Sequence, residues 1–156
     1  MPCKHQCLRL AFAIVASVST VLSSPAALAA LGGDVASVGR DRVQMKAGLR
    51  SDPGGNYTIH ELVTPTGTVV REYAATNGRI FAVTWSGPLM PDLRQLLGQY
   101  FAAYVADQGP QRGGHGHRSM QGDGLVVQSS GHMRAFAGKA FLPAAIPAGV
   151  AIDALR

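Results

Sequence analysis

Alternating apolar and polar residues mark three consecutive β-strands in the middle of the chain. Segments 57–63, 68–74 and 80–85 are rich in β-branched and aromatic side chains, which favour an extended backbone. They are separated by segment 64–67, which contains a proline and a glycine, and by a turn centred on Asn-Gly at 77–78. Both are typical of hairpin connections. The pattern predicts a three-stranded antiparallel meander.

Two-residue turns in both hairpins would place two glutamates on an apolar face of this meander. Glu61 would then face Val70, and Ile59 would face Glu72. The apolar residues of the same face would be Tyr57, Ile59, Val63, Val70, Ala74, Phe81, Val83 and Trp85. If they are buried there, Glu61 and Glu72 have raised pKa values and can do acid/base work or hold a cation. The simpler interpretation is that one turn is longer than two residues, or that the glutamates lie at the sheet margin.

The clearest helical pattern begins after Pro91. Its apolar residues recur at spacings of three and four, at Leu93, Leu96, Leu97, Tyr100, Phe101 and Tyr104. Asp92 is suited to cap the first turn, with Gln95 at the capping-box spacing, and Gly-Pro at 109–110 would end the helix near residue 108. The short corner 86–91 forces this helix back onto the strand that ends at Trp85. We therefore expect the core to lie between the helix and the sheet.

Weaker patterns predict the segments before and after this unit. Segment 30–56 is expected to hold an N-terminal helix over residues 34–47, followed by a linker that breaks at Ser-Asp-Pro-Gly-Gly-Asn. Segment 109–124 is rich in glycine and contains two histidines, which predicts a flexible surface loop.

A second antiparallel pair is predicted over residues 125–130 and 133–141, with its turn at Gly131-His132. Together the elements predict an α+β fold with a single antiparallel sheet of about five strands: the three-stranded meander, then the central helix, then the hairpin. We expect the central helix and the N-terminal helix to pack on one face of that sheet.

The first 29 residues have the pattern of a secretory signal peptide. Lys4 and Arg9 precede an apolar run over residues 10–22, and small residues follow it, with Ala-Leu-Ala at 27–29 as the cleavage site. The run is shorter than the roughly 20 residues that span a bilayer. We expect cleavage near Ala29, a single exported domain over 30–156 in the periplasm or outside the cell, and no membrane span after cleavage. The alternative is that the segment is retained as an anchor.

Composition narrows the function classes further. Both cysteines, Cys3 and Cys7, lie in the predicted signal peptide, so the exported domain has no thiol chemistry. The net charge of +5 includes Lys4 and Arg9, and the other basic residues are scattered. This argues against nucleic acid as a partner. No phosphate-binding loop, dinucleotide fingerprint or EF-hand pattern occurs, so we expect no cofactor.

Two sets of residues are candidates for chemistry. Ser129 or Ser130 with His132 could form a nucleophile and its base, although Val127 stands where a nucleophile elbow would have glycine. The Glu61/Glu72 pair is the other catalytic candidate. A hydrolase or a metal-dependent enzyme that uses either set is therefore the alternative to a binding protein.

Histidines and arginines suggest two kinds of binding. His115 and His117 could present imidazoles to Zn²⁺ or Cu²⁺ in a metal-handling protein. His60 is expected opposite Arg71, and with Arg134 these residues could attract an anion. The predicted contact surface comprises Trp85, Arg134, His132, His60 and Arg71.

Several stretches together resemble a known family. They are His60-Glu61, residues 67–73, 81–83 with Trp85, Gly87-Pro88, 91–98, 129–138 and 147–150. The chain resembles the exported proteobacterial proteins grouped as domain of unknown function 2844. The resemblance covers the chain from Leu31 onward and implies a signal-bearing bacterial protein with no assigned activity. We accordingly expect an exported, non-catalytic accessory or binding protein whose partner is a protein or a small molecule of the cell envelope.

Overall fold

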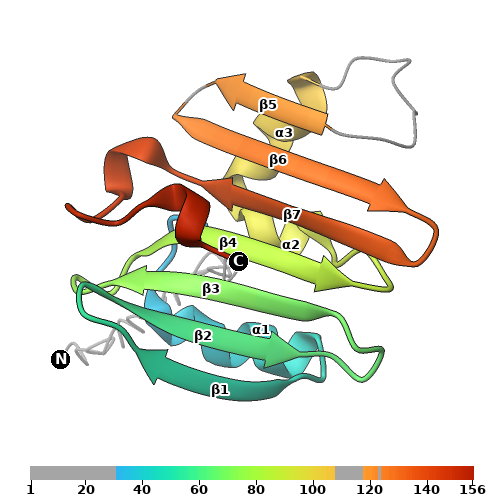
Figure 1. Cartoon of the computed structure of the whole chain (residues 1–156), viewed down its shortest axis with the longest axis horizontal. Helices are drawn as coiled ribbons and strands as arrows, with labels where there is room; N and C mark the ends of the chain where they lie inside the picture. The colour runs from blue at the N-terminus through green and yellow to red at the C-terminus, as the bar shows by residue number, and fades with distance from the viewer. Residues whose placement is uncertain (1–30, 108–117, 123) are drawn as a thin grey trace, which may run out of the picture.

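A computed structural model describes residues 31–107, 118–122 and 124–156. The predicted signal peptide, His115 and His117 lie outside the described residues. The described strands form one seven-stranded antiparallel sheet in the order β1-β2-β3-β4-β7-β6-β5 (Figure 1). Their bounds are Gly48–Pro53 (β1), Tyr57–Val63 (β2), Val69–Ala75 (β3), Ile80–Gly87 (β4), Arg118–Gly122 (β5), Leu125–His132 (β6) and Ala135–Phe141 (β7). The α+β prediction is confirmed.

The predicted number of five strands is wrong, because both edge strands were missed. Strand β1 lies within the predicted linker of segment 30–56, and β5 lies within the predicted loop 109–124. All six residues of β1 are exposed, and the strand ends in Ser-Asp-Pro. An edge strand pairs through its backbone on one side only, and it often carries polar residues and proline. Such a strand has no apolar alternation by which a sequence could reveal it.

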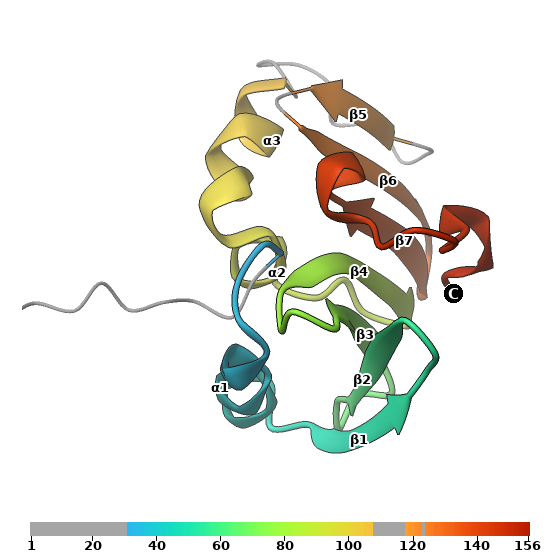
Figure 2. The ribbon, with the colours of Figure 1, turned by 90° about the vertical axis from the view of Figure 1, so that its left-hand side faces the viewer.

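The helices lie on one side of the sheet, which we call the helix face (Figure 2). They are α1 (Val38–Gln44), α2 (Leu93–Leu97) and α3 (Phe101–Asp107), with 3-10 turns before α1 and between α2 and α3. Asp92 caps α2 by accepting hydrogen bonds from the backbone N–H groups of Arg94 and Gln95. The predicted central helix is broken at Gly98, whose φ of 51° and ψ of −120° are not helical. No helix among the described residues has the length and apolarity needed to cross a membrane.

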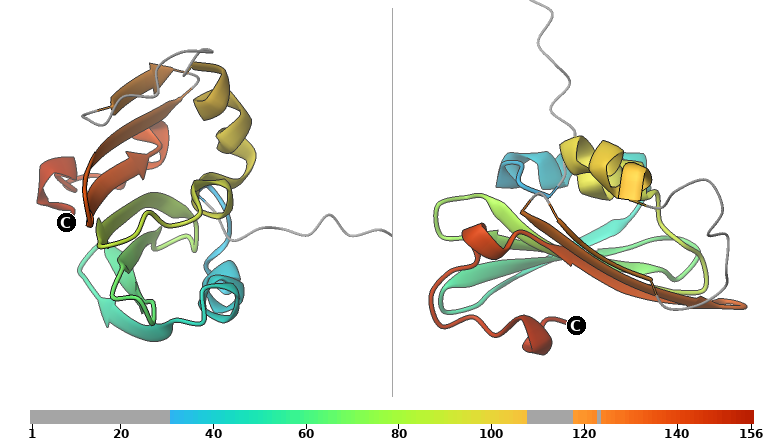
Figure 3. Two further views of the ribbon diagram at one scale, coloured as in Figure 1. Left: turned by 90° about the vertical axis from the view of Figure 1, so that its right-hand side faces the viewer. Right: turned by 90° about the horizontal axis from the view of Figure 1, so that it is seen from above.

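The main core lies between the helices and the helix face. Its buried residues include Leu62, Val70, Val83 and Trp85 from the sheet, with Leu96, Leu97 and Tyr104 from the helices. A smaller cluster on the opposite side, the open face, joins Tyr73, Phe81 and Ala82 to Leu155. Residues 143–156, the C-terminal segment, run across that face (Figure 3). Arg71 and Tyr73 hold its end by donating to the main-chain oxygen of Arg156, at 2.9 and 2.8 Å.

The predicted register of the first hairpin is wrong by one residue. Thr64 and Thr68 are joined by a backbone hydrogen bond of 2.9 Å, which leaves a three-residue loop. Its last residue, Gly67, has a φ of 85°, as in the common three-residue hairpin loop. Glu61 therefore pairs with Arg71, and Glu72 pairs with His60. Because side chains alternate between faces, the two glutamates lie on opposite sides of the sheet, and the interpretation of a longer turn is confirmed.

The second hairpin keeps the predicted pairs of Val70 with Trp85 and of Glu72 with Val83. The register then shifts between Tyr73, which pairs with Ala82, and Ala74, which pairs with Ile80. Phe81 is the extra residue between these two pairs. Phe81 packs with Tyr73 on the open face instead of joining Val83 and Trp85.

The last hairpin turns two residues later than predicted. His132 pairs with Ala135, so the turn consists of Met133 and Arg134 instead of Gly131 and His132. Arg134 has a φ of 60°, a left-handed conformation that favours glycine or asparagine. The usual sequence signal for a turn is therefore absent at the residue that makes it.

Candidate functional site

The serine and histidine candidates of the last hairpin do not assemble into a catalytic group. Ser129 is buried on the helix face, and Ser130, the next residue, points to the open face. The Ser130 hydroxyl donates to the main-chain oxygen of Ala137 at 3.4 Å. His132 is exposed at the end of the strand. No hydrogen bond between described residues joins His132 to either serine.

A different serine–histidine pair, which the sequence did not suggest, lies on the helix face. Ser51 Oγ and His60 Nδ1 are joined by a hydrogen bond of 2.8 Å across strands β1 and β2. Glu72 is the next residue of the same cross-strand row, so the order resembles a serine–histidine–acid arrangement. Burial lowers the pKa of His60, and the pKa of Glu72 is raised to about 9. Both groups are neutral at pH 7, so Glu72 supplies no negative charge to an imidazolium.

Glu72 belongs to a buried polar cluster beneath the helices. Asp41 from α1, Glu72 from β3 and Gln95 from α2 are each at most 4% exposed. The Gln95 side-chain amide donates to Asp41 Oδ1. Burial raises the pKa of Asp41. It also raises the pKa of Glu72 to about 9, and the negative charge of Asp41 adds to this rise. Both carboxyl oxygens of Glu72 and the second carboxylate oxygen of Asp41 are buried without a hydrogen-bond partner among the described residues. Glu72 is therefore neutral at pH 7 because it is buried beside another carboxyl group.

This cluster is buried between the helices and the sheet and is not an accessible site. The two cavities considered below include neither Asp41 nor Glu72 in their linings. Within the described ranges, no three His, Cys, Asp or Glu side chains are placed to hold a metal ion. The predicted Glu61/Glu72 pair does not exist, because the register separates the two carboxyl groups.

The open face carries a continuous row of polar residues across all seven strands. Each residue is directly opposite the next, so their side chains share one face. In sheet order the polar row is Arg50, Glu61, Arg71, Thr84, Lys139, Gln128 and Ser119. The neighbouring row contains Ile59, Tyr73, Ala82 and Phe141, which the C-terminal segment helps to cover.

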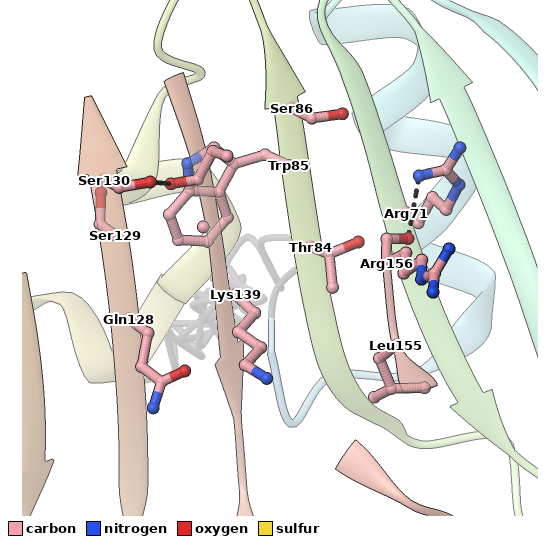
Figure 4. Close-up of a pocket in the computed structure, with 12 residues that line it drawn as sticks. Arg71, Thr84, Trp85, Ser86, Gln128, Ser129, Ser130, Lys139, Leu155 and Arg156 are labelled. Atoms are coloured by element: carbon pink, nitrogen blue, oxygen red, sulfur yellow. Dashed lines mark hydrogen bonds between the residues drawn. The ribbon is translucent and has the colours of Figure 1, made fainter. Parts of the chain in front are cut away.

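Four of the seven residues of the polar row line a trough of about 370 Å³ on the open face. Its polar side chains come from β3, β4, β7 and β6, and the end of the C-terminal segment bounds it (Figure 4). They are Arg71, Thr84, Ser86, Lys139, Gln128 and Ser130, with Leu155 and Arg156 at the boundary. The trough is therefore the candidate functional site.

The groups in the trough differ in how well they are paired. Arg71 donates to Glu61 at 2.8 Å and to the main chain of Arg156, so it is well engaged. Lys139 Nζ lies 3.5 Å from an oxygen of Asp153, whose side chain is fully exposed. The Thr84 hydroxyl is buried and has no hydrogen-bond partner among the described residues. Lys139 and Thr84 are thus both incompletely paired.

A second cavity of about 180 Å³ continues along the polar row beyond Arg71. Its lining contains Arg50 and Arg71 as well as Asp52 and Glu61, so its side-chain charges balance. This balance distinguishes it from the trough, whose lining contains no carboxylate side chain.

The predicted contact residues are spread over several parts of the molecule. Arg71 lines the trough. The Trp85 side chain is 2% exposed and lies in the main core, so it is not available at a surface. His60 lies on the helix face, where it pairs with Glu72 and not with Arg71. His132 and Arg134 are exposed at the last hairpin.

Comparison with known proteins decides the family. The model of the family described as "Protein of unknown function (DUF2844)" matches residues 27–155. The chain belongs to this family. The DUF2844 match includes every described helix and strand. Neither the curated proteins nor the solved structures give a match.

Proposed function

We propose that this DUF2844 chain is an exported, non-catalytic accessory or binding protein that takes a small molecule of the cell envelope into the trough. The observation that carries this proposal is the trough itself. Its volume of about 370 Å³ is within the range of roughly 300–1,000 Å³ that is usual for ligand pockets. Its lining combines apolar contact surface with a few polar side chains from four strands, which is the composition that fixes the orientation of a ligand.

Two features favour binding over catalysis. The lining residues come from strands of one rigid sheet, which keeps their spacing fixed. The Ser130 hydroxyl in the lining already donates to the main chain, and no histidine lines the trough to activate it. Metal binding by His115 and His117 stays a separate prediction.

Export is tested by following the N-terminus. When the full chain is expressed in a Gram-negative host, the product in the periplasm or medium is expected to begin near residue 30, as N-terminal sequencing would show. An Ala29→Arg variant should keep the full-length mass, because signal peptidase requires a small residue before the cleavage site. Full-length wild-type chain in the cytoplasm would contradict export.

Ligand binding is tested by filling the trough. Ala137 lines the trough and is exposed on β7, so Ala137→Trp should block the trough without entering the core. We expect at least one compound of an envelope extract to be retained by the wild-type protein in equilibrium dialysis with mass spectrometry, and to be lost with this variant.

A matched control is available on the same strand. Ala135 is exposed, lies two residues before Ala137 on the same face, and is not part of the trough lining. Ala135→Trp should therefore retain the compound. Equal retention by both tryptophan variants, or no retained compound at all, would contradict the proposed function.

A further inference from the structure

The charged side chains that line the trough are all cationic. Three cationic residues line it, Arg71, Lys139 and Arg156, and no acidic side chain does. Arg71 is already held by Glu61 and by the main chain. Lys139 has only the contact of 3.5 Å with Asp153. That distance is longer than the roughly 2.7–2.9 Å of a good charge-assisted hydrogen bond, so the Lys139 ammonium group has capacity for another anionic partner.

Neutral polar groups lie on both sides of Lys139. Thr84 on β4 and Gln128 on β6 are its two direct cross-strand neighbours. Because adjacent strands are about 4.8 Å apart, the three side chains span the width of a small molecule. The Thr84 hydroxyl is buried without a partner among the described residues, and a buried polar group in that state is destabilising until an acceptor or donor reaches it.

From this arrangement we infer that the trough binds a small organic anion, with its carboxylate or phosphate group held by Lys139 and hydrogen-bonded by Thr84 and Gln128. The inference rests on the proposed function and specifies its ligand class. The anionic group takes the place that Asp153 occupies at longer range, so Asp153 competes with the ligand for Lys139. The apolar part of the ligand lies against Leu155 and the backbone around Gly138, which also line the trough.

Three simple probes test the charge requirement. Benzoate and phenyl phosphate carry the proposed group on a ring, and benzamide has nearly the shape of benzoate without its charge. In NMR titrations of the exported domain at low salt, we expect saturable binding of both anions with a Kd of about 1–10 mM. Benzamide should bind about tenfold more weakly, because it lacks the charge-assisted hydrogen bond.

Two substitutions with opposite expected effects locate the site. Lys139→Met removes the charge and keeps the aliphatic stem, so benzoate affinity should fall about tenfold. Asp153→Asn removes the competing carboxylate and should raise affinity about two- to threefold, as is typical of an exposed ion pair. Lys46→Met is the matched control, because Lys46 is an exposed lysine outside the trough. This variant changes the net charge equally and should leave affinity within about twofold.

The outcomes separate this inference from the proposed function. Equal affinity for benzamide and benzoate, equal losses for Lys139→Met and Lys46→Met, or no saturable binding of either anion would overturn the anion site. The proposed function would still stand if a neutral compound were retained by the wild-type protein and lost only with Ala137→Trp. If the wild-type protein and the Ala137→Trp variant retained the same compounds equally, both the anion site and the proposed function would be overturned.

Discussion

Replacing Gly138 by alanine is expected to destabilise the protein by about 3 kcal/mol. A Cβ at this position would lie 2.3 Å from Trp85 Cζ2 and 2.6 Å from the main-chain oxygen of Gln128. Gly138 pairs with Trp85 on one side and with Ser129 on the other, so the backbone cannot move away without disturbing two strand pairings. The indole ring of Trp85 occupies the space that a side chain at residue 138 would need. Urea denaturation followed by circular dichroism measures the loss.

Gly39→Ala is the matched control for this prediction. Gly39 lies in α1, and a Cβ added there meets no atom within 4 Å. The free energy of unfolding should stay the same or rise by up to about 1 kcal/mol, since alanine favours the helix. A Trp85→Leu background should reduce the cost of Gly138→Ala, because the indole clash is then absent while the close approach to Gln128 remains. A Gly138→Ala protein within about 1 kcal/mol of the wild type would contradict this packing.

The elements that could be predicted from the sequence are those with a local signal. Asn-Gly at 77–78 predicts the second hairpin and the correct pairing of Val70 with Trp85. Asp92 caps α2 as predicted, although the Gln95 side chain donates to Asp41 and no hydrogen bond among the described residues completes the capping box with it. In each case the residues that form the signal also form the structure, so no distant contact is needed to interpret them.

The first hairpin shows how a small local uncertainty changes a whole face. Segment 64–67 suits a turn, but its residues do not distinguish a two-residue turn from the observed loop, which ends at Gly67. The difference of one residue moves Glu72 to the helix face beside Asp41 and leaves Glu61 on the open face beside Arg71. The predicted carboxylate pair and the predicted pairing of His60 with Arg71 were both wrong for this single reason.

The trough could not be predicted, because its parts meet only through the strand order. Thr84 and Lys139 are neighbours because β7 inserts next to β4, and Gln128 joins them because β6 follows β7. Lys139 is one of several scattered basic residues in the sequence and has no motif around it. Ser51 was missed for a related reason: its contact with His60 requires β1, an edge strand without apolar alternation. Long-range pairing therefore determines the site, whereas local pattern determines most of the elements.

The second large effect is expected for Glu72→Gln, which should stabilise the protein by about 3 kcal/mol at pH 7. Glu72 has a pKa of about 9 in the folded protein and an ordinary value of 4.5. Above pH 4.5 the unfolded chain releases this proton while the folded protein keeps it, so stability falls as the pH rises, by about 1.4 kcal/mol per unit. Glutamine has nearly the same shape, stays neutral at every pH, and carries an amide group that can donate to a neighbouring carboxylate. Urea denaturation at pH 5, 7 and 8.5 measures the difference, which should increase with pH.

The surroundings of Glu72 give this pH dependence its sign. Asp41 faces it from α1, Gln95 contacts Asp41 from α2, and His60 is its cross-strand neighbour. Burial lowers the pKa of His60 below its ordinary value of 6.5, so the imidazole is neutral at pH 7 and above. It therefore gives Glu72 no positive charge that would favour ionisation. Glu61→Gln removes the same formal charge on the open face and should leave the steep pH dependence of the wild type in place. If the stabilities of the wild-type and Glu72→Gln proteins changed in parallel between pH 5 and 8.5, Glu72 would have to be ionised in the folded core, and the assignment of its proton would be wrong.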